Sequence, residues 1–339
     1  MLNDLLRRLM GRPERLAPSP DAGGREPRHA SPSVSDVDYT LDIASLERLF
    51  LTWAFGLSDD DAAADASAAD AAFAHLQMVA QRFDVRRMPR LPALVPQLMA
   101  AMRRDDADAG EIAGLLSRDP TLAGDVMRVA CSAYYALAQP PSGLRQAVQR
   151  IGHDGLRQVV LATVMRPILR GDAGLPGHAM ASRLWSQAEA RAWLCGRLAP
   201  GLADPAEAQL AGIVAGTGVA ALSRMVHPSM LADAAADPSF AARFLELARP
   251  VSVRAATHWH MPATVLDALE NADCTPLGRV LAAGDRLAMG YRLIESGRLA
   301  GDASWPTGIA SHDAPDRRAA LYVAMSHEVE PLEPEPAAA

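Results

Sequence analysis

The chain has 339 residues, 50% of them hydrophobic, and a formal net charge of −7 at pH 7. This length and apolar content supply one large domain or two small ones with a packed core. All 33 basic residues are arginine, which excludes a lysine nucleophile or a P-loop lysine, and the acidic balance leads us to expect no nucleic-acid partner.

The sequence carries no signal for membrane insertion or secretion. No apolar run reaches the roughly 18 residues that span a bilayer, and charges interrupt the leucines at the start of the chain, unlike in a secretory signal. Cys131, Cys195 and Cys274 are widely spaced and odd in number, which predicts neither a disulfide framework nor a thiolate metal cluster. We expect a cytoplasmic protein without a transmembrane segment and without a cofactor.

Two regions of different character begin the chain. Residues 1–36 are rich in Pro, Ser, Gly and Arg and are predicted to form a disordered leader. In residues 37–87, two sets of apolar side chains recur at helical spacing. The first set is Leu46, Leu49, Phe50 and Trp53, and the second is Phe73, Leu76 and Val79. We therefore predict an N-terminal extension of two helices over residues 37–87.

From Met88 onward, helix signals follow one another closely. The predicted helices start at Asp108, Asp119 and Ser142 and then cover Leu156–Met165, Trp185–Leu198, Ala206–Met225, Phe240–Trp259, Ala263–Asn271 and Leu277–Ile294. A turn at Gly152–Gly155 separates the helix from Ser142 from the next one. Because strand-like alternation is nearly absent, we predict an all-α fold. Residues 296–339 are expected to hold a C-terminal helix, Pro315–His327, and a disordered acidic tail.

The stretch AGIVAGTGVA, residues 211–220, has the glycine content of a phosphate-binding loop. Its G-x-x-x-G-x-G pattern matches neither the Rossmann fingerprint nor a Walker motif, and no predicted strand precedes it. Its apolar residues at helical spacing favour a helix with a small-residue face. Because each glycine costs a helix about 1 kcal/mol relative to alanine, we expect either close helix packing or a local break here.

An ordered series of motifs runs through the helical region. The series is LPALVPQLM (91–99), LLSRDPTLAGDVMRVACSAYY (115–135), LRQAVQRIGHDGLRQVVLATV (144–164), LW (184–185), AQLAGIVAGTG (208–218), HWHMP (258–262) and GDRLA (284–288). It resembles the HDOD family, bacterial signalling domains related to HD-type metal phosphohydrolases. One departure is Cys131, where the family usually has Asn before Ser-Ala. The resemblance implies an HD-like multi-helix bundle, with the HDOD domain over residues 88–295.

The resemblance also implies where a metal site would lie. An HD hydrolase looks like a bundle that holds its metal with a His on one helix, a His-Asp pair on a second and an Asp on a third, since one carboxylate alone cannot hold and use a divalent ion. In this chain the first His aligns near Gln187, and the pair falls on Ala215 and Gly216. Only the last ligand remains, as Asp285. We therefore expect a degenerate HD site with no bound metal and no catalytic residue.

These replacements lead us to expect a non-enzymatic bacterial signalling protein that works through protein partners or as a sensing module. Arg128, Tyr134, Tyr135 and Trp259 are the candidates for its interaction surface. One alternative is a divergent metal-dependent phosphohydrolase rebuilt around Asp285 and the histidines of HWHMP. Another is a sensor that binds a cyclic dinucleotide in the former metal cleft. The oligomeric state and the role of the 37–87 helices stay open at this point.

Overall fold

The structure of the protein is a computed structural model that describes residues 41–57, 66–88, 94–102, 104, 108–131, 141–170, 177–225, 227, 230–231, 237–272, 274–309 and 315–329. Every regular element in these ranges is a helix, which confirms the predicted all-α fold. The predicted leader, residues 1–36, and residues 330–339 of the predicted tail lie outside the described residues.

The described helices follow the predicted order. They are α2 (Ile43–Phe55), α3 (Ala66–Arg82), the 3-10 turn Val85–Arg87, α4 (Leu94–Met102), α5 (Ala109–Leu116), α6 (Pro120–Ala130), α7 (Leu144–Arg170), α8 (His178–Leu198), α9 (Pro205–Ala215), α10 (Thr217–Ser223), α12 (Pro238–His258), α13 (Ala263–Glu270), α14 (Pro276–Glu295) and α15 (Pro315–Glu328). Three helices, α6, α9 and α12, begin in the same way. The side chain of the preceding aspartate, Asp119, Asp204 or Asp237, accepts a hydrogen bond from a backbone N–H of the first turn, and a proline follows it. Such a pair presets the first helical turn and satisfies its free N–H groups.

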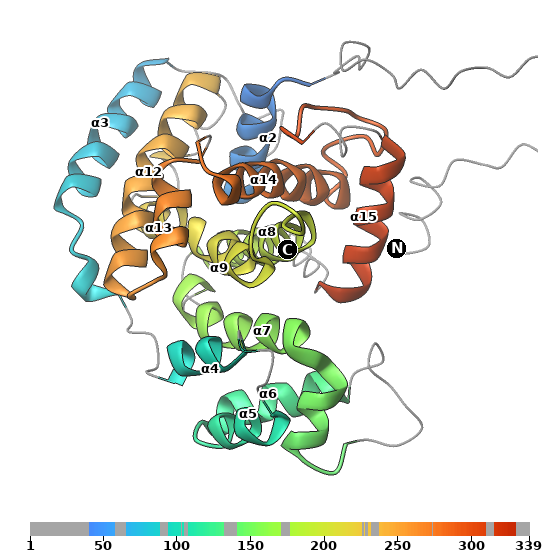
Figure 1. Cartoon of the computed structure of the whole chain (residues 1–339). Coiled ribbons are helices and arrows are strands. Elements are labelled where there is room, and N and C mark those ends of the chain that lie inside the picture. Colours follow the sequence, from blue (N-terminus) through green and yellow to red (C-terminus); the bar gives the residue numbers. More distant parts are fainter. Residues whose placement is uncertain are drawn as a thin grey trace, which may run out of the picture.

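The helices form two packed groups (Figure 1). The larger group contains α2, α3, α8, α9, α10 and α12 to α15 around one core, and the smaller contains α4, α5, α6 and α7 around another. α7 joins them, because Val160 is buried in the smaller core while Leu161 and Met165 are buried in the larger. The Gly152 backbone inside α7, with φ 74° and ψ 171°, is not helical, in agreement with the predicted turn there.

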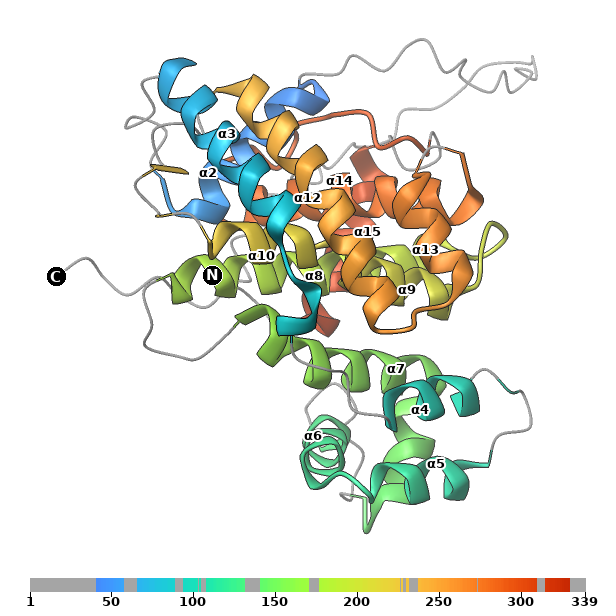
Figure 2. The same cartoon turned by 90° about the vertical axis from the view of Figure 1, so that its left-hand side faces the viewer.

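The N-terminal helices are part of the larger group. α2 packs against α12 and α14 and buries Leu46, Leu51 and Trp53, and α3 lies along α12 (Figure 2). The backbone N–H of Leu41 donates to the Ser304 carbonyl at 3.1 Å, which ties the start of α2 to the segment after α14. The described part of the 37–87 extension is therefore built into the main core.

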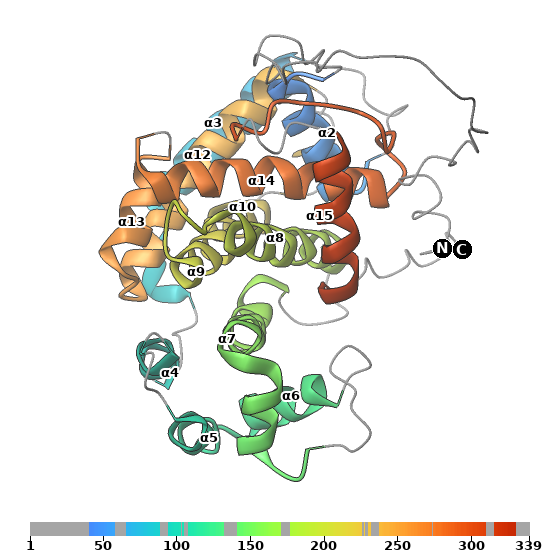
Figure 3. The same ribbon diagram turned by 45° about the vertical axis from the view of Figure 1, so that its right-hand side comes forward.

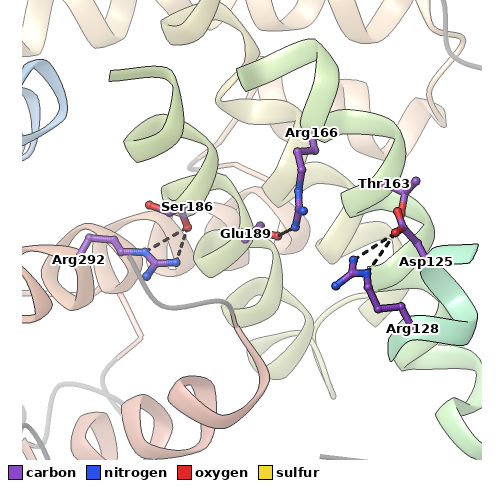
Figure 4. A network of polar contacts seen from close by, with 7 residues as sticks. All are labelled: Asp125, Arg128, Thr163, Arg166, Ser186, Glu189 and Arg292. Carbon is purple, nitrogen blue, oxygen red and sulfur yellow. Dashed lines mark hydrogen bonds and ion pairs between the residues drawn. The ribbon is translucent and has the colours of Figure 1, made fainter. Parts of the chain in front are cut away.

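Polar contacts fix α8 between its neighbours (Figure 4). Arg166 of α7 pairs with Glu189 of α8 at 3.5 Å. From the other side, the fully buried Arg292 of α14 donates through Nε and Nη2 to the Ser186 carbonyl of α8, at 3.2 Å and 2.7 Å. Because a buried charge requires such partners, these bonds restrict how α8 and α14 can shift against each other.

The chain after α14 closes over the same core. Trp305 is fully buried, and its ring lies so near Gly290 that a Cβ there would come within 2.0 Å of it. The Tyr322 hydroxyl of α15 donates to the Leu287 carbonyl at 2.9 Å, and α15 lies across α8 and α14 (Figure 3). The segment that follows α14 thus belongs to the larger group.

Among the described residues, one helical stretch, Pro205–Ser223, is long and apolar enough to cross a bilayer. Of its apolar window, 78% is buried inside the molecule, as in the core helix of a folded domain. It comprises α9 and α10, and its interior position brings the AGIVAGTGVA stretch to the centre of the larger group.

Candidate functional site

The four positions that the resemblance implies lie together in one cavity. Gln187 lies on α8, Ala215 and Gly216 are at the end of α9, and Asp285 lies on α14; all four line a cavity of about 180 Å³. α8 packs against both α9 and α14, which accounts for the meeting of residues as much as 98 positions apart.

A guanidinium group lies at this meeting point. Arg191, one turn after Gln187 on α8, pairs through Nη1 with Asp285 Oδ1 at 2.8 Å and donates through Nε to the Gly212 carbonyl at 2.5 Å. The Arg191 side chain is 7% exposed and that of Asp285 31%. Charge-assisted bonds of this kind are stronger than neutral ones. Arg191 therefore ties α8, α9 and α14 together inside the cavity.

Gly216 leaves the space that this guanidinium needs. A Cβ at position 216 would lie 2.5 Å from Nη2 of Arg191, closer than unbonded heavy atoms approach. Nη2 is itself buried and forms no hydrogen bond with any described residue. The guanidinium thus fills the space beside Ala215 and Gly216, where the resemblance implies a His-Asp pair.

The AGIVAGTGVA stretch, residues 211–220, has both a local helix break and close helix packing, the two alternatives that its sequence left open. The predicted helix Ala206–Met225 is present as two parts, α9, which ends at Ala215, and α10, which starts after Gly216 and ends at Ser223, so the local break is at Gly216. Ser252 of α12 bridges the break: its hydroxyl donates to the Ala215 carbonyl at 2.7 Å and accepts from the Gly218 N–H at 2.8 Å. Packing is also close, since a Cβ on Gly218 would lie 1.9 Å from the carbonyl oxygen of Ala248. A side chain inserted into the helix ladder is a known cause of such breaks.

Gln187 contributes a neutral amide that is held by the backbone of α14. In the orientation that satisfies both amide atoms, it donates to the Ala288 carbonyl at 3.1 Å and accepts from the Met289 N–H at 3.3 Å. The residue is only 2% exposed. Its role in the cavity is therefore to link α8 with α14.

The residues of this cavity do not fit a divalent metal ion. Asp285 is the only carboxylate among the four implied positions, whereas divalent ions take several oxygen, nitrogen or thiolate ligands. Arg191 also places a positive charge directly on that carboxylate. Within the described ranges, no three His, Cys, Asp or Glu side chains are grouped so that they could hold an ion. The charged groups at the implied metal position form an ion pair instead of a set of metal ligands.

Three further charged side chains line the same cavity. Glu47 comes from α2, Arg249 from α12 and Arg286 from α14. Burial raises the pKa of Glu47, and the negative charge of Asp285 adds to the rise, while Arg286 and Arg249 oppose it. The N-terminal helix thus covers one side of the cavity and contributes a carboxyl group to it.

The candidates for the interaction surface lie in different surroundings. Arg128 is exposed on α6 and pairs with Asp125 at 3.2 Å (Figure 4). Trp259 is only 4% exposed and belongs to the larger core, so the prediction that it contributes to a surface is wrong. A large aromatic ring at a helix end gains more from burial than from exposure. Tyr134 and Tyr135 lie outside the described residues.

The two histidines of HWHMP do not join the cavity. His258 ends α12, and His260 follows with a left-handed backbone at φ 55°. Neither lines the cavity that contains Asp285. The alternative enzyme site, built from these histidines and Asp285, is therefore not assembled in the structure.

Apart from Asp285, the charged residues of the cavity, Arg191, Glu47, Arg249 and Arg286, were not predicted from the sequence. Arg191 had a detectable signal, because it lies four residues after Gln187 and so on the same face of its helix. Glu47 and Arg249 had no such signal, because their position depends on how α2 packs against α12 and α14.

The helical architecture and this cavity define an HD-like all-helical domain. The HDOD domain family matches residues 88–274, more than half of the chain, so the chain belongs to the HDOD family.

Solved structures show the same fold. One is an HDOD domain protein with unknown function from Geobacter sulfurreducens, with 17% identity and a TM-score of 0.54, over 76% of this chain and 95% of that chain. Another, from Shewanella amazonensis, carries a provisional description as a phosphohydrolase, with 20% identity and a TM-score of 0.53, over 75% of this chain and 95% of that one. At these identities the likeness shows the fold alone. A search of curated proteins found no match to the chain.

Proposed function

We propose that this protein is a non-enzymatic bacterial signal-transduction protein, in which the HDOD domain binds protein partners or senses a ligand. The observation that supports it best is the pair of Arg191 with Asp285 in the cavity that would have to hold a metal. A divalent ion placed there would be repelled by the guanidinium, since two like unit charges 4 Å apart repel by about 4 kcal/mol at an effective dielectric constant of 20. We also infer a cytoplasmic location.

The rival function is metal-dependent phosphohydrolysis, as the description of the Shewanella amazonensis protein would suggest. That reaction needs a metal-bound water or a comparable nucleophile. In this chain Asp285 is engaged by Arg191, and positions 215 and 216 carry no ligating side chain. These replacements favour the regulatory function over the hydrolytic one.

A metal and turnover assay tests the choice. The purified full-length chain is incubated with Mg²⁺, Mn²⁺ or Fe²⁺, its metal content is measured, and hydrolysis of a chromogenic phosphodiester is followed. We expect substoichiometric metal and a rate equal to that of Asp285→Ala. Stoichiometric metal, together with turnover that Asp285→Ala abolishes, would overturn the proposal.

Partner binding is tested at the predicted interaction residues. We expect Arg128→Ala to weaken capture of the chain's partners from its native cell, and Tyr134→Ala with Tyr135→Ala to act in the same direction. Arg118→Ala, on an exposed residue of the same helical group, is the matched control. Truncation is restricted to residues 1–40, because removing α2 would open the main core.

A further inference from the structure

The cavity beside Arg191 has an unusual set of charges. Three arginines line it, Arg191, Arg249 and Arg286, against two carboxyl groups, Glu47 and Asp285. The pair with Arg191 neutralises Asp285. What remains at the wall is the positive charge of Arg249 and Arg286, opposed by Glu47.

The two remaining arginines come from different helices and reach the same space. Arg249 is an exposed residue of α12, and Arg286, on α14, is partly buried and donates through Nη1 to the Thr307 carbonyl at 3.3 Å. A guanidinium presents several N–H donors in one plane and matches the oxygens of a phosphate group. Two of them, from different helices but lining one cavity, can together hold one such group.

The size of the cavity restricts the ligand. Its volume of about 180 Å³ is below the roughly 300–1,000 Å³ of sites for drug-sized molecules. A cyclic dinucleotide would extend beyond this volume, and a compact molecule with one phosphate group matches it better. Apolar side chains such as Phe50 and Leu184 supply the rest of the wall.

We propose that this cavity binds a small phosphate-bearing molecule, with Arg249 and Arg286 holding its phosphate group. The proposal rests on the proposed function, to which it adds the class of ligand that the domain would sense. Because the cavity lies between α2 and the helices α8, α12 and α14, a bound ligand would contact the N-terminal helix and the HDOD helices together.

Glu47 is the group that opposes such a ligand. Its carboxyl group faces Asp285 and Arg286 of α14 and Arg249 and Glu246 of α12. Since a carboxylate repels a phosphate and competes for the same guanidinium groups, removing its charge should strengthen binding. Glu47→Gln keeps the size of the side chain and is the variant that separates this effect from packing.

The test is calorimetric titration of the full-length chain with inorganic phosphate at constant ionic strength, with chloride and acetate as control anions. We expect saturable binding of phosphate, weakened at least about tenfold by Arg249→Gln, since the substitution removes charge-assisted hydrogen bonds to the phosphate group. Glu47→Gln should strengthen it several-fold, and the exposed Arg118→Gln should leave it unchanged. Arg249 is the primary site because its side chain is exposed, whereas Arg286→Gln also removes a bond to Thr307.

Absence of saturable binding, equal binding of acetate, or an unchanged affinity in Arg249→Gln would overturn the ligand proposal. Those results would leave the proposed function standing if the metal and turnover assay is also negative. Conversely, metal-dependent turnover would refute the proposed function whatever the titration shows, so the two failures are distinguishable.

Discussion

Arg191 of α8 and Asp285 of α14 form an ion pair, with 2.8 Å between Nη1 and Oδ1, and the same guanidinium donates to the Gly212 carbonyl of α9. Replacing Arg191 with Met keeps an apolar stem of similar length and leaves both acceptors without their donor. We expect the free energy of unfolding, measured by urea denaturation, to fall by about 2 kcal/mol. This expected loss is smaller than that for a fully buried ion pair, because Asp285 is 31% exposed and water screens part of the interaction.

The same pair predicts non-additivity. Asp285→Asn combined with Arg191→Met removes both charges, so the double variant should be more stable than the sum of the two single changes predicts. Interaction energies between contacting residues are typically about 0.5–3 kcal/mol. Additive losses in the double-mutant cycle would show that the two side chains do not depend on each other.

Ser252 closes the break between α9 and α10 and is 1% exposed. Ser252→Ala leaves the Ala215 carbonyl and the Gly218 N–H without that partner in a buried place, and we expect a loss of about 1–3 kcal/mol of unfolding free energy. Ser117→Ala, at the exposed end of α5, should change it by less than about 0.5 kcal/mol. Equal effects of the two substitutions in denaturation curves would argue against a bridging role.

Two glycines should respond to alanine in opposite directions. Gly218→Ala places a Cβ within 1.9 Å of a backbone oxygen of α12, and overpacking of this kind costs about 1–3 kcal/mol or more. Gly124 lies in α6 with nothing near its Cβ position, so Gly124→Ala should raise the stability by up to about 1 kcal/mol. Thermal denaturation of both variants measures the sign of each change.

Glu47 should make the stability depend on pH. Its pKa is raised in the folded protein, so the folded state favours the protonated carboxyl. Its contribution is fully present below the ordinary value of 4.5 and is lost as the pH rises through the raised pKa. Because Glu47→Gln stays neutral, its advantage in unfolding free energy over the natural chain should grow with pH across this window and then level off.

A pH series of urea denaturation curves measures this difference. Glu270→Gln, at an exposed position of α13, serves as the matched control for loss of a surface charge. A difference between Glu47→Gln and the natural chain that shrinks as the pH rises would contradict the expected sign.

The helices could be predicted from the sequence because their signals are local. An aspartate cap before a proline, as at Asp119, and apolar residues at helical spacing, as around Phe50, act within one or two turns. The boundary at Gly216 could not be placed, because the break depends on Ser252, a residue of another helix. Trp259 was misjudged for a related reason: its burial is decided by packing that no local pattern reports.

For the candidate site, too, part could be predicted from the sequence and part depends on tertiary packing. The resemblance located Gln187, Ala215, Gly216 and Asp285, and the structure brings them to one cavity. The pairing of Arg191 with Asp285 was not predicted, because adjacent charges in a sequence such as Asp285-Arg286 give no information about contacts across helices. The contribution of α2 to the cavity depends on tertiary packing alone.

The position of α2 also has a consequence for biosynthesis. Its end contacts residues made much later, as in the hydrogen bond from Arg298 to the Leu57 carbonyl, which spans 241 positions. As the chain leaves the ribosome, α2 emerges before α12 and α14, the helices against which it packs. Its apolar face therefore stays without these packing partners until most of the protein has been translated. Contacts between residues so far apart in sequence slow folding. An apolar helix that is exposed during synthesis is a binding site for chaperones.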